Sequence, residues 1–204
     1  MIFMLGKDEN GANAGQVNQL IRGRRSVFPD QFERGKAVPD EIVWQLLENA
    51  NWAPNHKNTE PWRFRVFTGK GLTTFARFQA ARYKETAGDR FRPEKHEKLL
   101  TAPLACSHII AILLRRSIRV SIPEVEEIAA VACAVQNIYL SAPAYGLGGY
   151  WSSGGITYDP AAREFLELQE EDRLLGFFYL GAVRIPSPGS TRQPVREKTI
   201  WVNE

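Results

Sequence analysis

The 204-residue sequence is poor in the residues that build disulfides and metal centres. It contains two cysteines, Cys106 and Cys133, and three histidines, His56, His96 and His108. The histidines do not follow the spacing of metal ligands, so the sequence predicts no metal site. Both cysteines lie in apolar segments, and we interpret them as reduced core thiols in a reducing compartment.

Charge of one sign and long apolar runs are also scarce. There are 26 Lys and Arg against 23 Asp and Glu, a net charge of +3, whereas nucleic-acid binding usually needs a concentrated basic face. The longest strongly apolar run, 109–114, is too short to span a bilayer. Residues 1–10 do not have the pattern of a secretory signal. We therefore expect a cytoplasmic protein with no nucleic-acid or membrane partner.

The sequence does contain enough apolar residues for one sizeable core. They make up 44% of the chain, as in an ordinary globular domain. Residues 1–15 are rich in glycine and asparagine, and we expect a disordered lead-in there. No internal repeat or low-complexity linker divides the rest, so residues 16–204 are predicted to form a single domain.

Hydrophobic periodicity predicts a mixed α/β layer, in which about four strands are interleaved with helices around one core. Ser121 and Glu124 form a capping-box pattern before an alanine-rich helix, which belongs at the protein centre or at a dimer interface. Trp44 and Trp52 are most simply core residues. Helices are expected over about 16–23, 39–52, 72–84, near 98, after 121 and from 160, and strands over 62–66, 107–114 and 174–183, with a possible edge strand at 199–202.

Three segments carry groups suited to ligand binding. Arg24-Arg25-Ser26 places two guanidinium groups and a hydroxyl at a helix end, which suits a phosphate or an electron-rich carbonyl, unless it is only a solvated helix end. The polar loop 53–62 either binds a ligand or simply connects two elements. The five glycines of 145–155 either let backbone N–H groups approach a flat or charged ligand or form a flexible turn.

Together and in this order, these segments resemble the nitroreductase family of FMN-dependent oxidoreductases. Arg24-Arg25-Ser26 matches the family's Arg-Arg-Ser, and 53–62 matches its Ala-Pro…Gln-Pro-Trp loop. Asn55-His56-Lys57 is similar to the Asp-His-Lys of a small-subunit subgroup, and 147–154 is similar to that subgroup's Gly-Gly-x-Trp-Arg-Ser-Gly. The segment 176–181 ends in Leu-Gly as the family's apolar strand does, and 191–194 with Trp201 is similar to its tail. The match covers about 16–201.

The resemblance implies the α+β nitroreductase sandwich, an α/β/α arrangement with helices flanking a mixed, mainly antiparallel sheet. It also implies a homodimer that exchanges its C-terminal tails and holds two FMN sites at the interface. The chemistry would take place at flavin N5, so no side chain is implied as a catalytic group.

The resemblance further implies the cofactor-binding residues. Arg24 and Ser26 would meet the pyrimidine edge and the phosphate–ribityl tail of FMN, with Arg25 assisting, because a cation near N1 and O2 stabilises the anionic hydroquinone. His56, Asn58 and Glu60 would reach the flavin or the nicotinamide from the other subunit. Arg192 would hold the FMN phosphate. A loop along the flavin would direct a backbone N–H at N5, and this loop is formed by Trp151, Ser152, Ser153 and Gly154.

Three positions depart from the family pattern. Glu60 stands where the family has Gln, Ser152 stands where the subgroup has Arg, and Phe28 and Pro29 stand where a basic residue is common. These departures weaken the expected cationic contact to FMN unless Arg192 and Arg196 compensate.

The resemblance implies that the chain moves two electrons from NAD(P)H through flavin N5 to nitroaromatic, quinone or similar small-molecule acceptors by a ping-pong mechanism. The alternatives are a flavin-degrading or dehalogenating relative of the same fold, a flavin-binding carrier or sensor without turnover, and a flavin-free helical scaffold.

Overall fold

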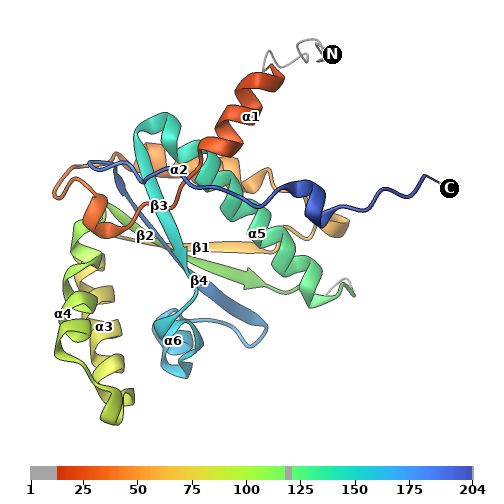
Figure 1. The fold of residues 1–204 in the computed structure, drawn as a ribbon. Coiled ribbons are helices and arrows are strands. Elements are labelled where there is room, and N and C mark those ends of the chain that lie inside the picture. Colours follow the sequence, from red (N-terminus) through yellow and green to blue (C-terminus); the bar gives the residue numbers. More distant parts are fainter. Residues whose placement is uncertain (1–12, 118–120, 204) are drawn as a thin grey trace.

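The computed structural model describes residues 13–117 and 121–203 and is built around one antiparallel sheet (Figure 1). Its four strands are β1 (Trp62–Thr68), β2 (His108–Arg115), β3 (Leu147–Ser152) and β4 (Asp172–Ala182), in the order β1-β2-β4-β3. The strands expected at 62–66, 107–114 and 174–183 are confirmed, and β4 is internal as predicted. Every strand pairing within the described residues is antiparallel.

Helices cover both faces of the sheet. They are α1 (Ala14–Gly23), α2 (Asp40–Asn51), α3 (Lys70–Thr86), α4 (Pro93–Thr101), α5 (Glu124–Ser141) and α6 (Pro160–Phe165). One core joins α2 and α5 to the sheet around Ile110 and Ile112, and the other joins α3 to the opposite face around Ile109 and Ala111. Successive β2 residues therefore alternate between two apolar cores. This arrangement is the expected α/β/α sandwich (Figure 1).

Both ends of the described chain leave this body. Helix α1 begins at Ala14, capped by Asn13, and has no buried residue. The predicted disordered lead-in falls mostly on residues 1–12, which lie outside the described residues. At the other end, residues 188–203 are exposed throughout, and the edge strand expected at 199–202 is wrong. Ile200 and Trp201 are 91% and 83% exposed.

Helix α5 differs from its prediction at its first turn. It begins at Glu124 after Pro123, without a side-chain cap, so the capping box at Ser121 is wrong. The Glu124 carboxylate instead pairs with Arg116 at 3.2 Å and with Arg173 at 3.4 Å. The segment Glu124–Tyr145 is long and apolar enough to cross a membrane by length and composition alone, a test that core helices of globular domains also pass.

Three side chains expected in the core lie outside it. Trp44 and Trp52 are 72% and 80% exposed, because the core side of α2 is formed by residues such as Leu46 and Ala50. Cys133 is exposed on the outer side of α5, whereas Cys106 is buried as expected. The outer sides of α2 and α5 therefore present apolar groups to the surroundings of the single chain.

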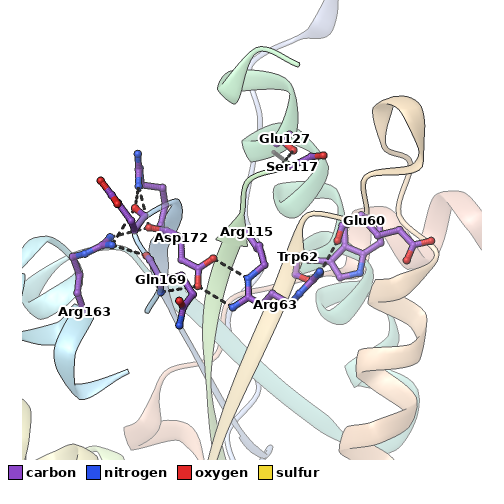
Figure 2. Close-up of polar contacts among 11 residues, drawn as sticks. Glu60, Trp62, Arg63, Arg115, Ser117, Glu127, Arg163, Gln169 and Asp172 are labelled. Atoms are coloured by element: carbon purple, nitrogen blue, oxygen red, sulfur yellow. Dashed lines mark hydrogen bonds and ion pairs between the residues drawn. The ribbon is translucent and has the colours of Figure 1, made fainter. Parts of the chain in front are cut away.

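A buried carboxylate holds together one end of the sheet. Asp172, at the start of β4, accepts two hydrogen bonds of 3.0 Å from the Arg115 guanidinium at the end of β2 (Figure 2). It also accepts the Gln169 backbone N–H at 3.1 Å. These hydrogen bonds, above all those from Arg115, hold the pKa of the Asp172 carboxyl below its usual value. The charged form of Asp172 therefore stabilises the folded chain.

We expect Asp172→Asn to lower the free energy of unfolding near neutral pH by roughly 1–2 kcal/mol, because it removes a charge-assisted pair from a buried site. A lowered folded-state pKa stabilises at pH values above the unfolded carboxyl pKa of about 3.9, and this contribution is lost as the pH falls below it. Melting temperatures between pH 3 and 7 should therefore converge for wild type and variant at acidic pH. Glu171→Gln, at the exposed neighbour, serves as the control, and a difference that persists undiminished at pH 3 would contradict the ionic origin.

Candidate functional site

The segment 24–28 lies along β3. The Val27 N–H donates to the Gly149 carbonyl at 2.9 Å. A Cβ built on Gly148 would lie 2.6 Å from Val27 Cγ2, so a glycine is required for this close approach. The glycine-rich segment predicted as a ligand-binding loop or a flexible turn is thus largely a strand, and at least Gly148 serves packing between protein segments. Two of the three predicted binding segments are therefore neighbours.

Arg24 and Trp151 are connected through Tyr139 of α5. The Arg24 guanidinium carbon lies 4.9 Å from the centre of the Tyr139 ring, a cation–π contact. The Tyr139 hydroxyl accepts the Trp151 backbone N–H at 2.6 Å. Among the described residues, Arg24 has no carboxylate within ion-pair distance. Its charge is therefore available to an anionic ligand.

Arg25 contacts the end of α1, and Ser26 contacts the segment after β4. The Arg25 guanidinium donates to the carbonyls of Arg22 at 2.6 Å and Arg24 at 2.8 Å, which caps the end of α1. This is the contact expected of a cation at a helix C-terminus. The Ser26 carbonyl accepts the Ser187 hydroxyl at 2.5 Å, so the segment after β4 is held beside the Arg-Arg-Ser segment.

A cleft of about 470 Å³ lies between helices α3 and α4 and the β3–β4 side of the sheet, and we call it the α3–β3 cleft. Ser152 and Gly154 line it, whereas Trp151 and Ser153 do not. Trp151 and Ser152 belong to β3, so the loop expected there begins only at Ser153. Phe28, at a position where the family commonly has a basic residue, contacts the cleft residue Tyr150 with ring centres 4.8 Å apart.

The loop 55–60 is strained. Lys57, Asn58 and Glu60 have φ angles of 53°, 51° and 43°, and each left-handed non-glycine residue costs about 1–2 kcal/mol. The Asn55 side chain accepts the Glu60 N–H at 3.0 Å, and the Arg63 guanidinium donates to the Glu60 carbonyl at 2.8 Å (Figure 2). Strain held in place by such contacts is typical of functional segments.

His56 in this loop contacts the first turn of α5. Its Nδ1 lies 2.6 Å from a carboxylate oxygen of Glu126, and both side chains are about half exposed. The side chains of Asn58 and Glu60 are exposed as well. The loop therefore presents its polar groups outward rather than to the rest of its own chain.

The predicted site residues do not all meet in one chain. His56 contacts Glu126, and Arg24 contacts Tyr139, thirteen residues later on the same helix. At about 1.5 Å per residue these contacts lie roughly 20 Å apart along α5. Arg192 joins neither group, because among the described residues its guanidinium bonds only Ser190 and Thr191 in the exposed tail.

Two residues that connect the candidate site, Tyr139 and Glu126, are not among the predicted site residues. Tyr139 has apolar neighbours along α5, and only the position of its hydroxyl at the edge of β3 reveals the connection to Trp151. Glu126 pairs with His56, whereas its neighbours Glu124 and Glu127 both pair with Arg116. No local sequence signal distinguishes these three carboxylates.

Comparison with known proteins gives a consistent result. The family model described as "Nitroreductase family" matches residues 21–182. The chain is 31% identical to the Escherichia coli K12 protein YdjA, provisionally named an NAD(P)H nitroreductase, over 78% of this chain and 85% of that protein. It is 30% identical to Bacillus subtilis YfhC, which carries the same provisional name, over 89% of this chain and 92% of that protein.

Solved structures agree with these relatives. A nitroreductase-like protein from Bacillus cereus superimposes with a TM-score of 0.80 at 28% identity, covering 92% of this chain and 96% of that one. A provisionally named nitroreductase from Desulfovibrio desulfuricans, solved in complex with FMN, superimposes with a TM-score of 0.70 at 27% identity, covering 92% and 97%.

Proposed function

The chain belongs to the nitroreductase family, and from this premise we propose that it is an FMN-dependent oxidoreductase of the cytoplasm. It transfers two electrons from NAD(P)H through the flavin to nitroaromatic, quinone or similar acceptors by a ping-pong mechanism. The family match over residues 21–182, together with a structural relative that is solved with FMN, carries this proposal. The names of YdjA and YfhC support NAD(P)H as the electron donor.

The residues present fit a planar, anionic cofactor. Arg24 has an unpaired guanidinium within the described part of the chain, and a phosphate or an electron-rich ring edge requires such donors. A Cβ built on Gly154 would meet nothing within 4 Å, so the backbone after β3 is open to a flat ring. The donor set and the open backbone both lie at β3.

We assign the cofactor contacts of one chain to Arg24, Ser26 and the segment 151–154, with Arg25 holding the end of α1 in place. The Tyr139 ring orients Arg24, and the Tyr139 hydroxyl holds the backbone N–H of Trp151. When bound, FMN accepts a hydride from NAD(P)H and passes two electrons to the acceptor. The chain positions the ring and supplies positive charge beside it, and water supplies the proton.

We assign His56, Asn58, Glu60 and Arg192 to a second copy of the chain, in a homodimer. The separation of roughly 20 Å along α5 leaves the 55–60 loop outside the Arg24 group of its own chain, and Arg192 lies in the exposed tail. An α1 helix without buried residues, an exposed apolar tail and exposed apolar groups on α2 and α5 all support a large interface. Exchange of the tails between subunits would bury Trp201 and bring Arg192 to the partner's site.

The spectrum of the purified protein tests this function. We expect flavin absorbance in the visible range, bleaching by NADPH or NADH without oxygen, and recovery on adding a nitroaromatic or a quinone. Bound FMN that NAD(P)H does not bleach would indicate a binding protein without turnover. Destruction of the ring under oxygen would indicate a flavin-degrading enzyme. A colourless protein that does not bind added FMN would exclude all three.

A further inference from the structure

The α3–β3 cleft carries two cations without a counter-charge. Arg90 and Lys95 line it, and within the described ranges neither has a carboxylate at ion-pair distance. The third lining cation, Arg82, pairs with Asp159 at 2.9 Å and also with Glu85. Because Asp159 is the carboxylate that lines the cleft and is neutralised by Arg82, the cleft has an excess of positive charge.

Tyr83 contacts the backbone of Arg90 and the side chain of Lys95. Its hydroxyl donates to the Arg90 carbonyl at 3.1 Å and accepts the Arg92 N–H at 2.9 Å, which fixes the turn between α3 and α4. The Lys95 Nζ lies 4.6 Å from the centre of the same ring. The backbone that carries Arg90 and the Lys95 ammonium are therefore both positioned before a ligand arrives, which lowers the entropic cost of binding.

The inner wall of the cleft is aromatic. Phe177 and Tyr179 are buried, and Tyr150 stacks on Tyr179 with ring centres 4.9 Å apart. Burial raises the pKa of Tyr150 to about 12, so its phenol is neutral near pH 7 and adds no negative charge. Such a wall suits a flat aromatic molecule, and Ser152 and Gly154 connect it to the proposed cofactor segment.

We propose that the α3–β3 cleft selects planar aromatic acceptors that carry an anionic substituent, which Arg90 and Lys95 bind. The inference rests on the proposed function, because it names the acceptor class of that same enzyme. An anionic acceptor gains charge-assisted hydrogen bonds from two positioned cations, whereas a neutral acceptor of the same shape gains only contact with the aromatic wall.

The test compares 4-nitrobenzoate with its neutral counterpart 4-nitrobenzamide. We expect wild type to have a higher kcat/KM with 4-nitrobenzoate than with 4-nitrobenzamide. The R90Q/K95Q variant should lower kcat/KM for 4-nitrobenzoate about tenfold and change kcat/KM for 4-nitrobenzamide less than about twofold. K98Q is the matched control, since Lys98 is exposed on the same helix and does not line the cleft. The preference should shrink at about 0.5 M salt, and calorimetric binding of benzoate to the FMN-loaded protein should weaken in parallel.

The other possible results of this experiment point to different roles for Arg90 and Lys95 or contradict the proposed function. A raised FMN dissociation constant in R90Q/K95Q would overturn the proposal in favour of a contact to the FMN phosphate. A loss confined to NADPH, with NADH unchanged, would overturn it in favour of the nucleotide 2′-phosphate. Equal kcat/KM for both acceptors in wild type would overturn it outright. An FMN-loaded protein that reduces neither acceptor nor any quinone would contradict the proposed function instead.

Discussion

Arg24→Ala is expected to raise the FMN dissociation constant about 10- to 100-fold, because it removes charge-assisted hydrogen bonds worth roughly 1.5–3 kcal/mol. Arg24 has the properties that such a role requires. It caps α1 beside β3, packs over Tyr139, and has no carboxylate partner among the residues that the structure describes. Titration of the FMN-free protein with FMN, followed by flavin fluorescence, measures the constant directly.

Arg22→Ala is the matched control for this experiment. Arg22 is exposed in the last turn of α1, where its backbone carbonyl accepts from Arg25, and within the described residues its side chain makes no hydrogen bond or ion pair. The substitution therefore removes the same charge a short distance away and leaves the contacts of Arg24 intact. Equal FMN binding by wild type and Arg24→Ala would remove Arg24 from the site, whereas equal weakening by both variants would indicate a general effect of charge.

Most of the fold was predictable because three of the four strands carry a strong local signal. β2 and β4 are apolar runs of strand length, and β1 alternates apolar and charged residues from Trp62 onward. The exception is β3, in which Gly148 and Gly149 hide the strand pattern. Its glycines are explained only by tertiary contacts, since a Cβ at Gly149 would lie 2.3 Å from the Tyr179 carbonyl oxygen. Side chains such as Trp44 were misplaced because an apolar residue type does not by itself show which side of a helix faces the core of its own chain.

The candidate site was predictable only in its segments. Short motifs in a fixed order indicated 24–26, 53–62 and 147–154, but their relative positions depend on α5. That helix places Glu126 at one end and Tyr139 near the other. The 55–60 loop contacts Glu126 through His56, and the arginine segment contacts Tyr139 through Arg24. In the proposed homodimer, which copy supplies which residue is a property of the assembly, so no pattern along one chain contains it.

A mixed dimer separates the two possible arrangements of the site. One chain carries Arg24→Ala, and the other carries His56→Ala with Asn58→Ala, each with a different affinity tag. If the arginine segment of one chain meets the loop of its partner, a mixed dimer has one site with all substitutions and one site with none. We therefore expect half of its sites to bind FMN with the wild-type dissociation constant, although each variant homodimer binds weakly at both sites.

The opposite arrangement predicts no recovery. If Arg24 and His56 of the same chain served one site, every site of the mixed dimer would carry a substitution, and FMN binding would stay weak. The roughly 20 Å between their contacts on α5 argues against this arrangement. Failure of the two tagged chains to purify together would exclude the dimer itself. If the homodimer with His56→Ala and Asn58→Ala binds FMN as tightly as wild type, the exposed, strained loop lacks the contact proposed for it. His56 and Asn58 would then be removed from the site.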